Sequence, residues 1–287
     1  MQLSLDCIPC SVNSIRRLLN TAMIPEKDKE PLMRKLLAFL AEADYTLSPP
    51  VLGREMHRMI RQQLNIPDPY RDIKEKYNRM MLDRFPEFEK KVEQAKDPFD
   101  SAMRLAIAGN VIDFGARRQL DIMETINRVM YAQFAIDDSR QLRRDLRDAH
   151  TLLYIGDNCG EIVLDKLFLQ YLHVPELYFA VRGGPIINDI TFEDARMVGI
   201  DRVAKVISTG DDSPGVVWET SSEEFKQVFN KADVIISKGQ GNLEGLIDIP
   251  QNIYFLLVVK CALIGSRFGV KEGQFVVKRS SLHQSKN

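Results

Sequence analysis

The chain has 287 residues, of which 45% are hydrophobic and 28% are charged, a balance typical of a globular protein. Lysine and arginine together number 39 against 40 acidic residues, so the formal net charge is −1. This charge provides no general attraction for nucleic acid or an anionic membrane, and we expect neither as a partner. An anionic ligand would have to be attracted by local charge.

The sequence predicts a cytoplasmic protein. Its N-terminus has no basic region followed by an apolar run, which a signal peptide requires. The longest apolar stretch, 253–265, is interrupted by Lys260 and is too short to span a bilayer. Four cysteines in a chain of this length do not make a disulfide framework.

The first half of the chain reads as helical, because charged and apolar residues alternate at helical spacing. This pattern predicts helices at 12–20, 28–43, 51–64, 72–81, 86–95, 99–108, 122–133 and 137–149. We therefore expect residues 1–150 to form a helical domain.

The second half alternates between short apolar runs and helical segments. The runs predict strands at 151–155, 176–181, 202–207, 233–236 and 252–259, with 274–277 as an additional edge strand. Strand–helix alternation of this kind is typical of a parallel sheet with right-handed crossovers. We expect residues 151–287 to form an α/β domain.

Hard oxygen donors follow the first two expected strands. Asp157 and Asn158 come directly after the first strand, and Asp189 follows the second, about one strand–helix–strand crossover later. Ligands bind at the carboxyl ends of parallel strands, so these side chains are expected at one edge of the sheet. Carboxylate and amide oxygens suit Mg²⁺ or Mn²⁺.

Cationic and glycine-rich segments are expected at the same edge. Arg182 and Gly183 follow the second strand, and Lys238 follows the fourth with Gly239, Gly241 and Asn242 close behind. Glycines expose amide groups, and a lysine adds a compact positive charge. Together these features predict a phosphate cradle beside a metal ion, an arrangement suited to phosphoryl transfer.

Each of these loops has a simpler interpretation when taken alone. An Asp-Asn pair after a strand commonly makes a turn and a helix cap, and a Lys-Gly-x-Gly segment is commonly a loop. The convergence of three such loops on one edge favours the functional interpretation.

Two further pairs of residues leave alternatives open. Asn110 and Asp113 lie three residues apart in an apolar stretch. They either form a structural hydrogen bond or orient a metal ligand. Cys7 and Cys10 lie just before the first expected helix. Packing or a small metal site is favoured there over a redox pair, because the strand that precedes a thioredoxin CxxC is missing.

Short sequence motifs of this chain resemble those of one known family. Its motifs run in order through nearly the whole chain: Cys7-Ile8-Pro9-Cys10, Asp68-Pro69-Tyr70 with Lys74, Ala108-Gly109-Asn110-Val111-Ile112-Asp113-Phe114-Gly115, Asp157-Asn158-Cys159-Gly160-Glu161, Arg182-Gly183-Gly184-Pro185, Asn188-Asp189-Ile190-Thr191 with Asp194-Ala195, and Lys238-Gly239-Gln240-Gly241-Asn242. They resemble the damage-control phosphatases, also called the acidic-residue-methyltransferase-like domain. The closer resemblance is to the bacterial and archaeal branch with an N-terminal CxxC.

The resemblance implies a helical region on a Rossmann-like, three-layer α/β/α domain and metal-dependent hydrolysis of small phosphorylated metabolites. Sugar phosphates, nucleotides or related damaged metabolites are the implied substrates, and Mn²⁺, Mg²⁺, Co²⁺ or Ni²⁺ the implied cofactors. The family's metal ligands correspond to Asp157, Asn158 and Asp189, and its phosphate-binding lysine to Lys238, with Glu161 a further candidate for orienting a ligand. Cys159 replaces an expected alanine, which leaves the ligands in place.

Two other functions remain as alternatives. An S-adenosylmethionine-dependent methyltransferase would use a similar sheet, although its first loop usually holds more glycines than the two at Gly156 and Gly160. A non-catalytic regulator that binds a metal or nucleotide would share all of these loops. For the phosphatase, the sequence leaves open whether a metal-activated water or a covalent aspartyl-phosphate carries the reaction.

Overall fold

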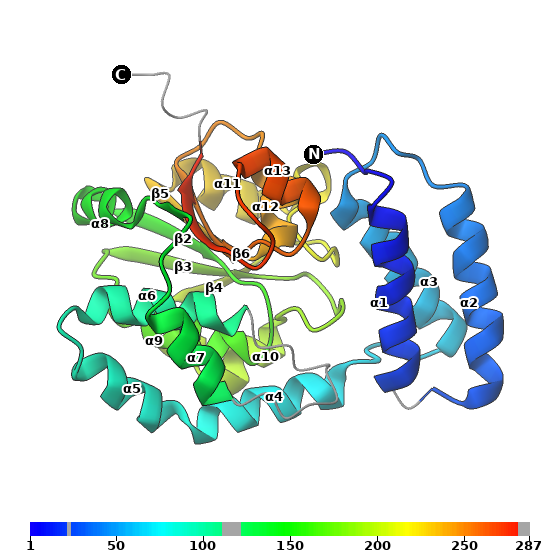
Figure 1. Ribbon diagram of the computed structural model, residues 1–287, viewed down its shortest axis with the longest axis horizontal. Coiled ribbons are helices and arrows are strands. Elements are labelled where there is room, and N and C mark those ends of the chain that lie inside the picture. Colours follow the sequence, from blue (N-terminus) through cyan, green and yellow to red (C-terminus); the bar gives the residue numbers. More distant parts are fainter. Residues whose placement is uncertain (22–23, 111–121, 281–287) are drawn as a thin grey trace.

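The computed structural model describes residues 1–21, 24–110 and 122–280. The first half is helical, as expected (Figure 1). Its helices are α1 (Cys7–Thr21), α2 (Glu26–Ala41), α3 (Pro49–Leu64), α4 (Arg71–Asp83), α5 (Phe85–Glu93), α6 (Pro98–Gly109), α7 (Ile122–Met130) and α8 (Ser139–Asp148). One expectation here is wrong: Cys7 and Cys10 do not precede the first helix but lie in its first turns.

A seven-stranded sheet forms the centre of the molecule, with strand order β1-β7-β6-β5-β2-β3-β4. The strands are β1 (Ile136–Asp137), β2 (Thr151–Ile155), β3 (Glu176–Val181), β4 (Lys205–Ser208), β5 (Val234–Lys238), β6 (Ile253–Val258) and β7 (Phe275–Arg279). Only β7 runs antiparallel to its neighbour β6, and the other pairings of the described sheet are parallel. The expected α/β fold is confirmed.

Two element boundaries differ from the expectation. The expected helix at 137–149 begins later, because Ile136 and Asp137 pair with Val276 and Val277 of β7. So short a strand has no periodicity of its own, and only its partner reveals it. The fourth expected strand ends two residues later than its apolar run, so Lys238 is the last residue of β5 rather than part of a loop.

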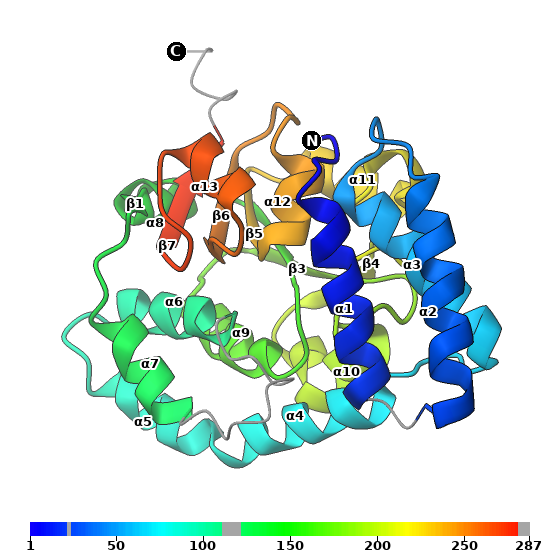
Figure 2. The same ribbon diagram turned by 45° about the vertical axis from the view of Figure 1, so that its right-hand side comes forward.

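Helices cover both faces of the sheet. They are α9 (Glu161–Leu169), α10 (Phe192–Val198), α11 (Glu223–Lys231), α12 (Gln240–Leu246) and α13 (Ala262–Phe268), with the short 3₁₀ turns η1 (Ile200–Arg202) and η2 (Trp218–Thr220). The central strands β2, β5 and β6 are buried at every position, which is typical of a parallel sheet covered on both sides. Figure 2 shows α6, α9 and α10 on the side of the sheet opposite α12 and α13.

The N-terminal helices divide into two groups by packing. Residues of α1, α2 and α3 form a hydrophobic cluster of their own, centred on Ile15, Leu32 and Leu36. Residues of α4 to α7 instead share one cluster with the sheet, and α6 lies along α9. This grouping does not follow the expected boundary at residue 150, which stays a prediction about domain organisation.

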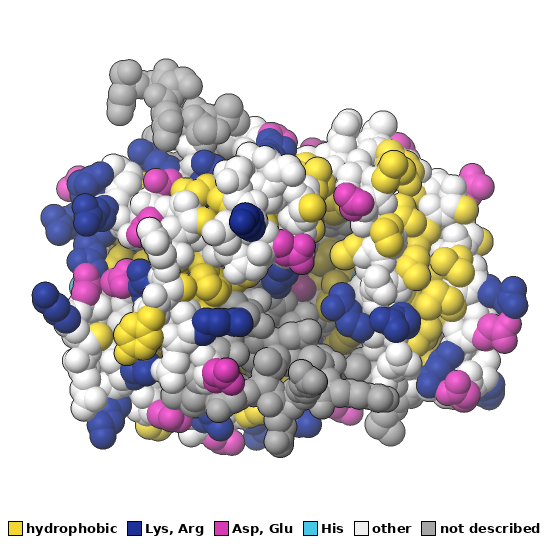
Figure 3. Space-filling model, in the orientation of Figure 1, with side chains coloured by type: hydrophobic (Ala, Val, Ile, Leu, Met, Phe, Trp, Pro, Cys, Tyr) yellow, Lys and Arg dark blue, Asp and Glu magenta, His cyan; other side chains and the backbone are white. Residues whose placement is uncertain are grey.

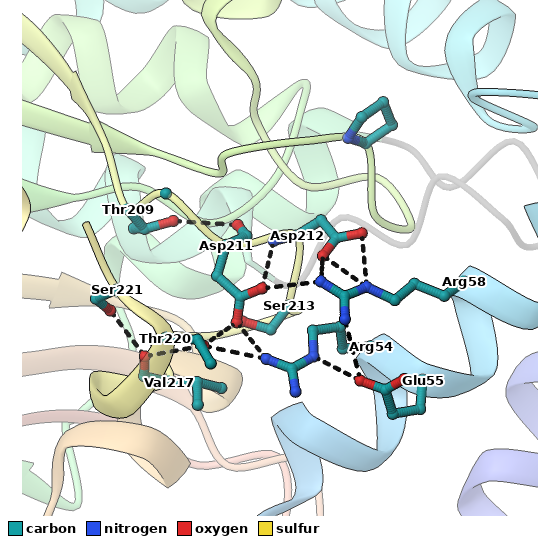
Figure 4. A network of polar contacts seen from close by, with 12 residues as sticks. Arg54, Glu55, Arg58, Thr209, Asp211, Asp212, Ser213, Val217, Thr220 and Ser221 are labelled. Carbon is teal, nitrogen blue, oxygen red and sulfur yellow. Dashed lines mark hydrogen bonds and ion pairs between the residues drawn. The ribbon is translucent and has the colours of Figure 1, made fainter.

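An ion-pair network joins α3 to the loop after β4 (Figure 4). Arg54 Nη1 lies 2.7 Å from Asp211 Oδ2, and Arg58 Nη2 lies 2.5 Å from Asp212 Oδ1. Arg61 also pairs with Asp212. Positions 54, 58 and 61 fall on one face of a helix, so a single stripe of arginines docks α3 beside the carboxyl edge of the sheet.

Few large apolar side chains are exposed among the residues that the structure describes. Hydrophobic side chains gather over α1 and α2 on the face seen in Figure 3. Leu5, just before α1, and Leu37, in α2, are among the exposed large apolar residues. None of the described helices combines the length and the apolar character that a membrane crossing requires.

Candidate functional site

The loops after β2 and β3 lie directly against each other. Cys159 N donates to Asn188 O at 2.8 Å, and Ile190 N donates to Asp157 O at 3.1 Å. An isolated antiparallel bridge also pairs Asn158 with Asp189. These backbone contacts bring Asp157, Asn158 and Asp189 together at the carboxyl edge, where the strand-end argument placed them.

The backbone at this edge contains two unusual positions. Ile187 has a φ of 43°, a left-handed conformation that a β-branched residue rarely adopts, two residues before Asp189. Gly239 has a φ of 75°, and a Cβ there would lie 2.0 Å from Asp157 Oδ2. Only glycine therefore allows the chain after β5 to pass so close to the Asp157 carboxylate.

Asp157 is held by two amide groups. Its Oδ2 accepts hydrogen bonds from Asn158 Nδ2 at 2.6 Å and from Asn110 Nδ2 at 2.9 Å. Both amides also donate to Glu161 Oε2, each at 3.1 Å. Burial raises the pKa of Asp157 to about 7, and repulsion by Glu161 and Asp189 adds to the rise.

Asp189 is held by a buried arginine. Arg182 Nε donates to Asp189 Oδ2 at 2.7 Å, and Arg182 Nη1 donates to Asn242 Oδ1 at 2.8 Å. Asn242 in turn donates to the backbone oxygen of Gly156 at 3.1 Å. Burial raises the pKa of Asp189, although Arg182 opposes the rise.

The charges around these loops fit a divalent cation. Buried acidic side chains outnumber buried cations here and leave an excess of negative charge; the acids are Asp157, Glu161, Asp165, Asp189 and Asp194, and the cations are Lys74, Arg182 and Lys238. Uncompensated buried charge is costly, and a divalent ion would neutralise it. Among the described residues no three His, Cys, Asp or Glu side chains gather as ligands. The expected set contains only two such side chains, because its third donor is an amide.

Several residues expected to contact substrate are buried, or bond to or pack against other parts of the protein instead. Lys238 is fully buried, and Arg182 and Asn242 are buried and bonded as described above. Gly183 N donates to Asp211 O at 2.8 Å, and Gly239 N donates to Leu256 O at 3.2 Å. Gly241 is packed against the backbone of Pro214. Asp113 lies outside the described residues.

Lys238 departs most clearly from its expected placement. Its Nζ donates to Glu161 Oε1 and Asp165 Oδ1, both at 2.6 Å, and to Ala106 O at 2.8 Å. Burial alone would lower the pKa of Lys238, but Asp165 and Glu161 hold it above its usual value. The expectation of a lysine facing a substrate phosphate is therefore at odds with this geometry, because three protein oxygens take up the three ammonium hydrogens.

A second lysine, which the sequence argument overlooked, is exposed and acts electrostatically on Asp157. Lys260 follows β6, and its charge opposes the rise in the pKa of Asp157. Its backbone N donates a hydrogen bond of 3.0 Å to Gln240 Oε1, which places this segment beside α12. Within the described part of the chain no acidic side chain forms an ion pair with Lys260. The strand-end rule would have found it, since the expected strand 252–259 ends one residue earlier.

The cysteines of α1 lie near a third thiol. Cys7 Sγ lies 3.5 Å from both the backbone N and the Oγ of Ser4. Burial raises the pKa of Cys10, and the nearby Cys7 and Cys261 contribute to the rise. Cys261 directly follows Lys260, so the start of α1 lies close to the segment that carries this exposed lysine.

Comparison with known proteins identifies the family. The family model described as "Damage-control phosphatase ARMT1-like domain" matches residues 3–276. The chain belongs to this family. It is 35% identical to a damage-control phosphatase of Pyrococcus horikoshii over 98% of its own length and 99% of that protein. It is 30% identical to a damage-control phosphatase of Archaeoglobus fulgidus over 79% of its length and 81% of the relative.

A solved structure shows the same fold. The crystal structure of a DUF89 family protein from Pyrococcus horikoshii superposes with a TM-score of 0.89 at 33% sequence identity. The match covers 98% of this chain and 100% of the other. The damage-control phosphatase family and the α/β fold expected from the sequence are thus confirmed, whereas assignment to the branch with the N-terminal CxxC stays a prediction.

Proposed function

We propose that this damage-control phosphatase family member hydrolyses small phosphorylated metabolites with the help of one divalent cation, Mn²⁺, Mg²⁺, Co²⁺ or Ni²⁺. Asp157, Asn158 and Asp189 would hold the ion. The observation that carries this proposal is the excess of buried negative charge around Asp157 and Asp189, which a divalent cation would balance. The names of the relatives support the phosphatase activity.

The bound ion would polarise the phosphoryl group and neutralise charge that develops on its oxygens. The chain's own residues supply the rest. Arg182 keeps the Asp189 carboxylate oriented through the 2.7 Å bond from Nε. Asn110 and Asn158 fix Asp157 Oδ2, and the other oxygen, Oδ1, which lies 3.7 Å from Arg182 Nη2, would face the ion. Lys260, which is exposed and whose charge acts on Asp157, would bind the substrate phosphate.

The decisive experiment is a phosphatase screen of the purified protein. Phosphate release is measured over a panel of sugar phosphates, nucleotides and phosphopantetheine compounds, with each of the four metals and with a chelator. Turnover that requires metal and is lost in Asp157→Ala supports the proposal. Absence of phosphate release with every metal contradicts it. Binding of S-adenosylmethionine, measured on the same preparation by calorimetry, would favour the methyltransferase alternative instead.

A further inference from the structure

Lys238 connects the centre of the molecule to the carboxylates at the sheet edge. It is the last residue of β5, and its side chain is fully buried. The ammonium group lies between Glu161 and Asp165 of α9 and the backbone oxygen of Ala106 in α6. Asp165 Oδ1 also accepts a hydrogen bond of 2.6 Å from Tyr154 OH. The group is thus fixed from several sides.

A continuous chain of hydrogen bonds runs from Lys238 to Asp157. Lys238 holds one oxygen of Glu161, Oε1, at 2.6 Å. The other oxygen, Oε2, accepts from the amide nitrogens of Asn110 and Asn158. The same two nitrogens donate to Asp157 Oδ2. Every link is made by a defined donor and acceptor.

This chain determines which way the Asn158 amide faces. Its nitrogen is directed to Glu161 and Asp157, so its carbonyl oxygen is turned away from them. Only that oxygen can bind a cation. Without Lys238, Glu161 Oε1 would lose the ammonium group that holds it, the carboxylate would shift, and the acceptor that orients Asn158 would be lost.

We propose that Lys238 is a positioning residue for the cation site: it holds Glu161 so that Asn158 presents its carbonyl oxygen and Asp157 its second oxygen, Oδ1, to the ion. This inference rests on the proposed function, because it assumes a cation held by Asp157, Asn158 and Asp189. It differs from the family-based expectation in that Lys238 acts on metal binding and makes no contact with the substrate phosphate.

The two roles predict opposite results for Lys238→Met. The test measures Mn²⁺ affinity of the folded protein by electron paramagnetic resonance, and orthophosphate affinity of the Mn²⁺-saturated protein by calorimetry. Loss of a group that orients a metal ligand should weaken Mn²⁺ binding by about tenfold or more. Orthophosphate affinity should change by less than about threefold, because no ammonium hydrogen is directed to the ligand. Unchanged Mn²⁺ affinity with weakened orthophosphate binding overturns the proposal.

Asp165→Asn is the matched control. It changes another hydrogen bond of the same lysine, the one to Asp165. The hydrogen bonds that connect Lys238 through Glu161 to Asn158 stay intact. Mn²⁺ affinity should stay within about threefold of wild type, since the oriented ligands are unaffected. A loss equal to that of Lys238→Met would reveal a general packing effect and overturn the proposal.

A double-mutant cycle keeps the test valid if Lys238→Met does not fold. Glu161→Gln and the double variant Lys238→Met, Glu161→Gln are compared, and the double variant buries fewer unpaired charges. If Lys238 acts through Glu161, its replacement adds no further loss of Mn²⁺ affinity in the Glu161→Gln background. An additional loss of about tenfold on going from Glu161→Gln to the double variant overturns the inference. A wild-type protein that binds no Mn²⁺ would instead overturn the proposed function itself.

Discussion

Asn110 Nδ2 donates a hydrogen bond of 2.9 Å to Asp157 Oδ2 across 47 residues of sequence. The bond joins the C-terminal end of α6 to the loop after β2, and both side chains are buried. A second bond from the same nitrogen reaches Glu161. The helical half of the chain therefore takes part in fixing a carboxylate of the candidate metal site.

Asn110→Ala should weaken Mn²⁺ binding by about tenfold, because Asp157 loses one of the two amides that orient it. Calorimetric titration of the folded variant with Mn²⁺ measures the change. Asn252→Ala is the matched control, since Asn252 is also buried and donates to an acid, Asp145, but lies at the start of β6. Equal losses in both variants would assign Asn110 a purely structural role.

The carboxylates could be located from the sequence because their positions depend on chain order alone. Asp157, Asn158 and Asp189 follow apolar runs that are unmistakable, and parallel strands bring their ends together. Lys238 could not be placed in the same way. The sequence left open whether β5 ends at residue 236 or 238, and side chains alternate between the two faces of a sheet only within a strand, so the direction of the Lys238 side chain could not be predicted. Its acid partners on α9 become visible only in three dimensions.

Asp157→Asn should stabilise the metal-free protein while it abolishes hydrolysis. The carboxylate is buried beside Glu161 and Asp189, and the resulting rise in its pKa shows that the charged form is unfavourable in the fold. An amide removes that repulsion, so the melting temperature in chelator should rise by about 3 °C or more. Differential scanning fluorimetry at pH 8 measures it. A lower melting temperature would show that the carboxylate is already compensated without metal.

Lys260→Ala should raise KM for a phosphate ester by about tenfold or more, because a charge-assisted hydrogen bond to the phosphate is lost. Mn²⁺ affinity should remain nearly unchanged, since a protonated lysine does not ligate a cation. Steady-state kinetics and a Mn²⁺ titration test the two parts. Lys271→Ala, an exposed lysine in the loop after α13, serves as the control and should leave KM unchanged. Equal KM in the two variants would remove Lys260 from the phosphate site.

The stability of the protein should fall in mild acid because of His57. Burial in α3, with repulsion by Arg61, lowers the pKa of His57 from 6.5 to about 4. A lowered folded-state pKa means that the unfolded chain binds the proton more tightly. The contribution of His57 is therefore fully present above pH 6.5 and is lost as the pH falls toward 4. The difference corresponds to about 3 kcal/mol of unfolding free energy.

Urea unfolding of wild type and His57→Gln between pH 7.5 and 4.5 checks this expectation. The glutamine variant should be less stable at pH 7.5 but should lose less stability on acidification. Parallel curves for the two proteins would mean that other groups cause the acid sensitivity.

Replacement of both cysteines of α1 should lower stability but leave catalysis per folded molecule unchanged. Cys7 packs against the hydrophobic cluster of α1, α2 and α3, and both cysteines belong to a helix rather than to the strand ends that carry the carboxylates. The double variant Cys7→Ser, Cys10→Ser should therefore melt at a lower temperature and keep its kcat.

The alternative is that the thiols of α1 belong to the catalytic site. Its physical basis is that Cys10 lies near Cys261, which directly follows Lys260. Turnover and melting temperature are measured together, with Cys261→Ser as the comparison. A double variant that is stable but inactive would place the thiols of α1 in the catalytic site.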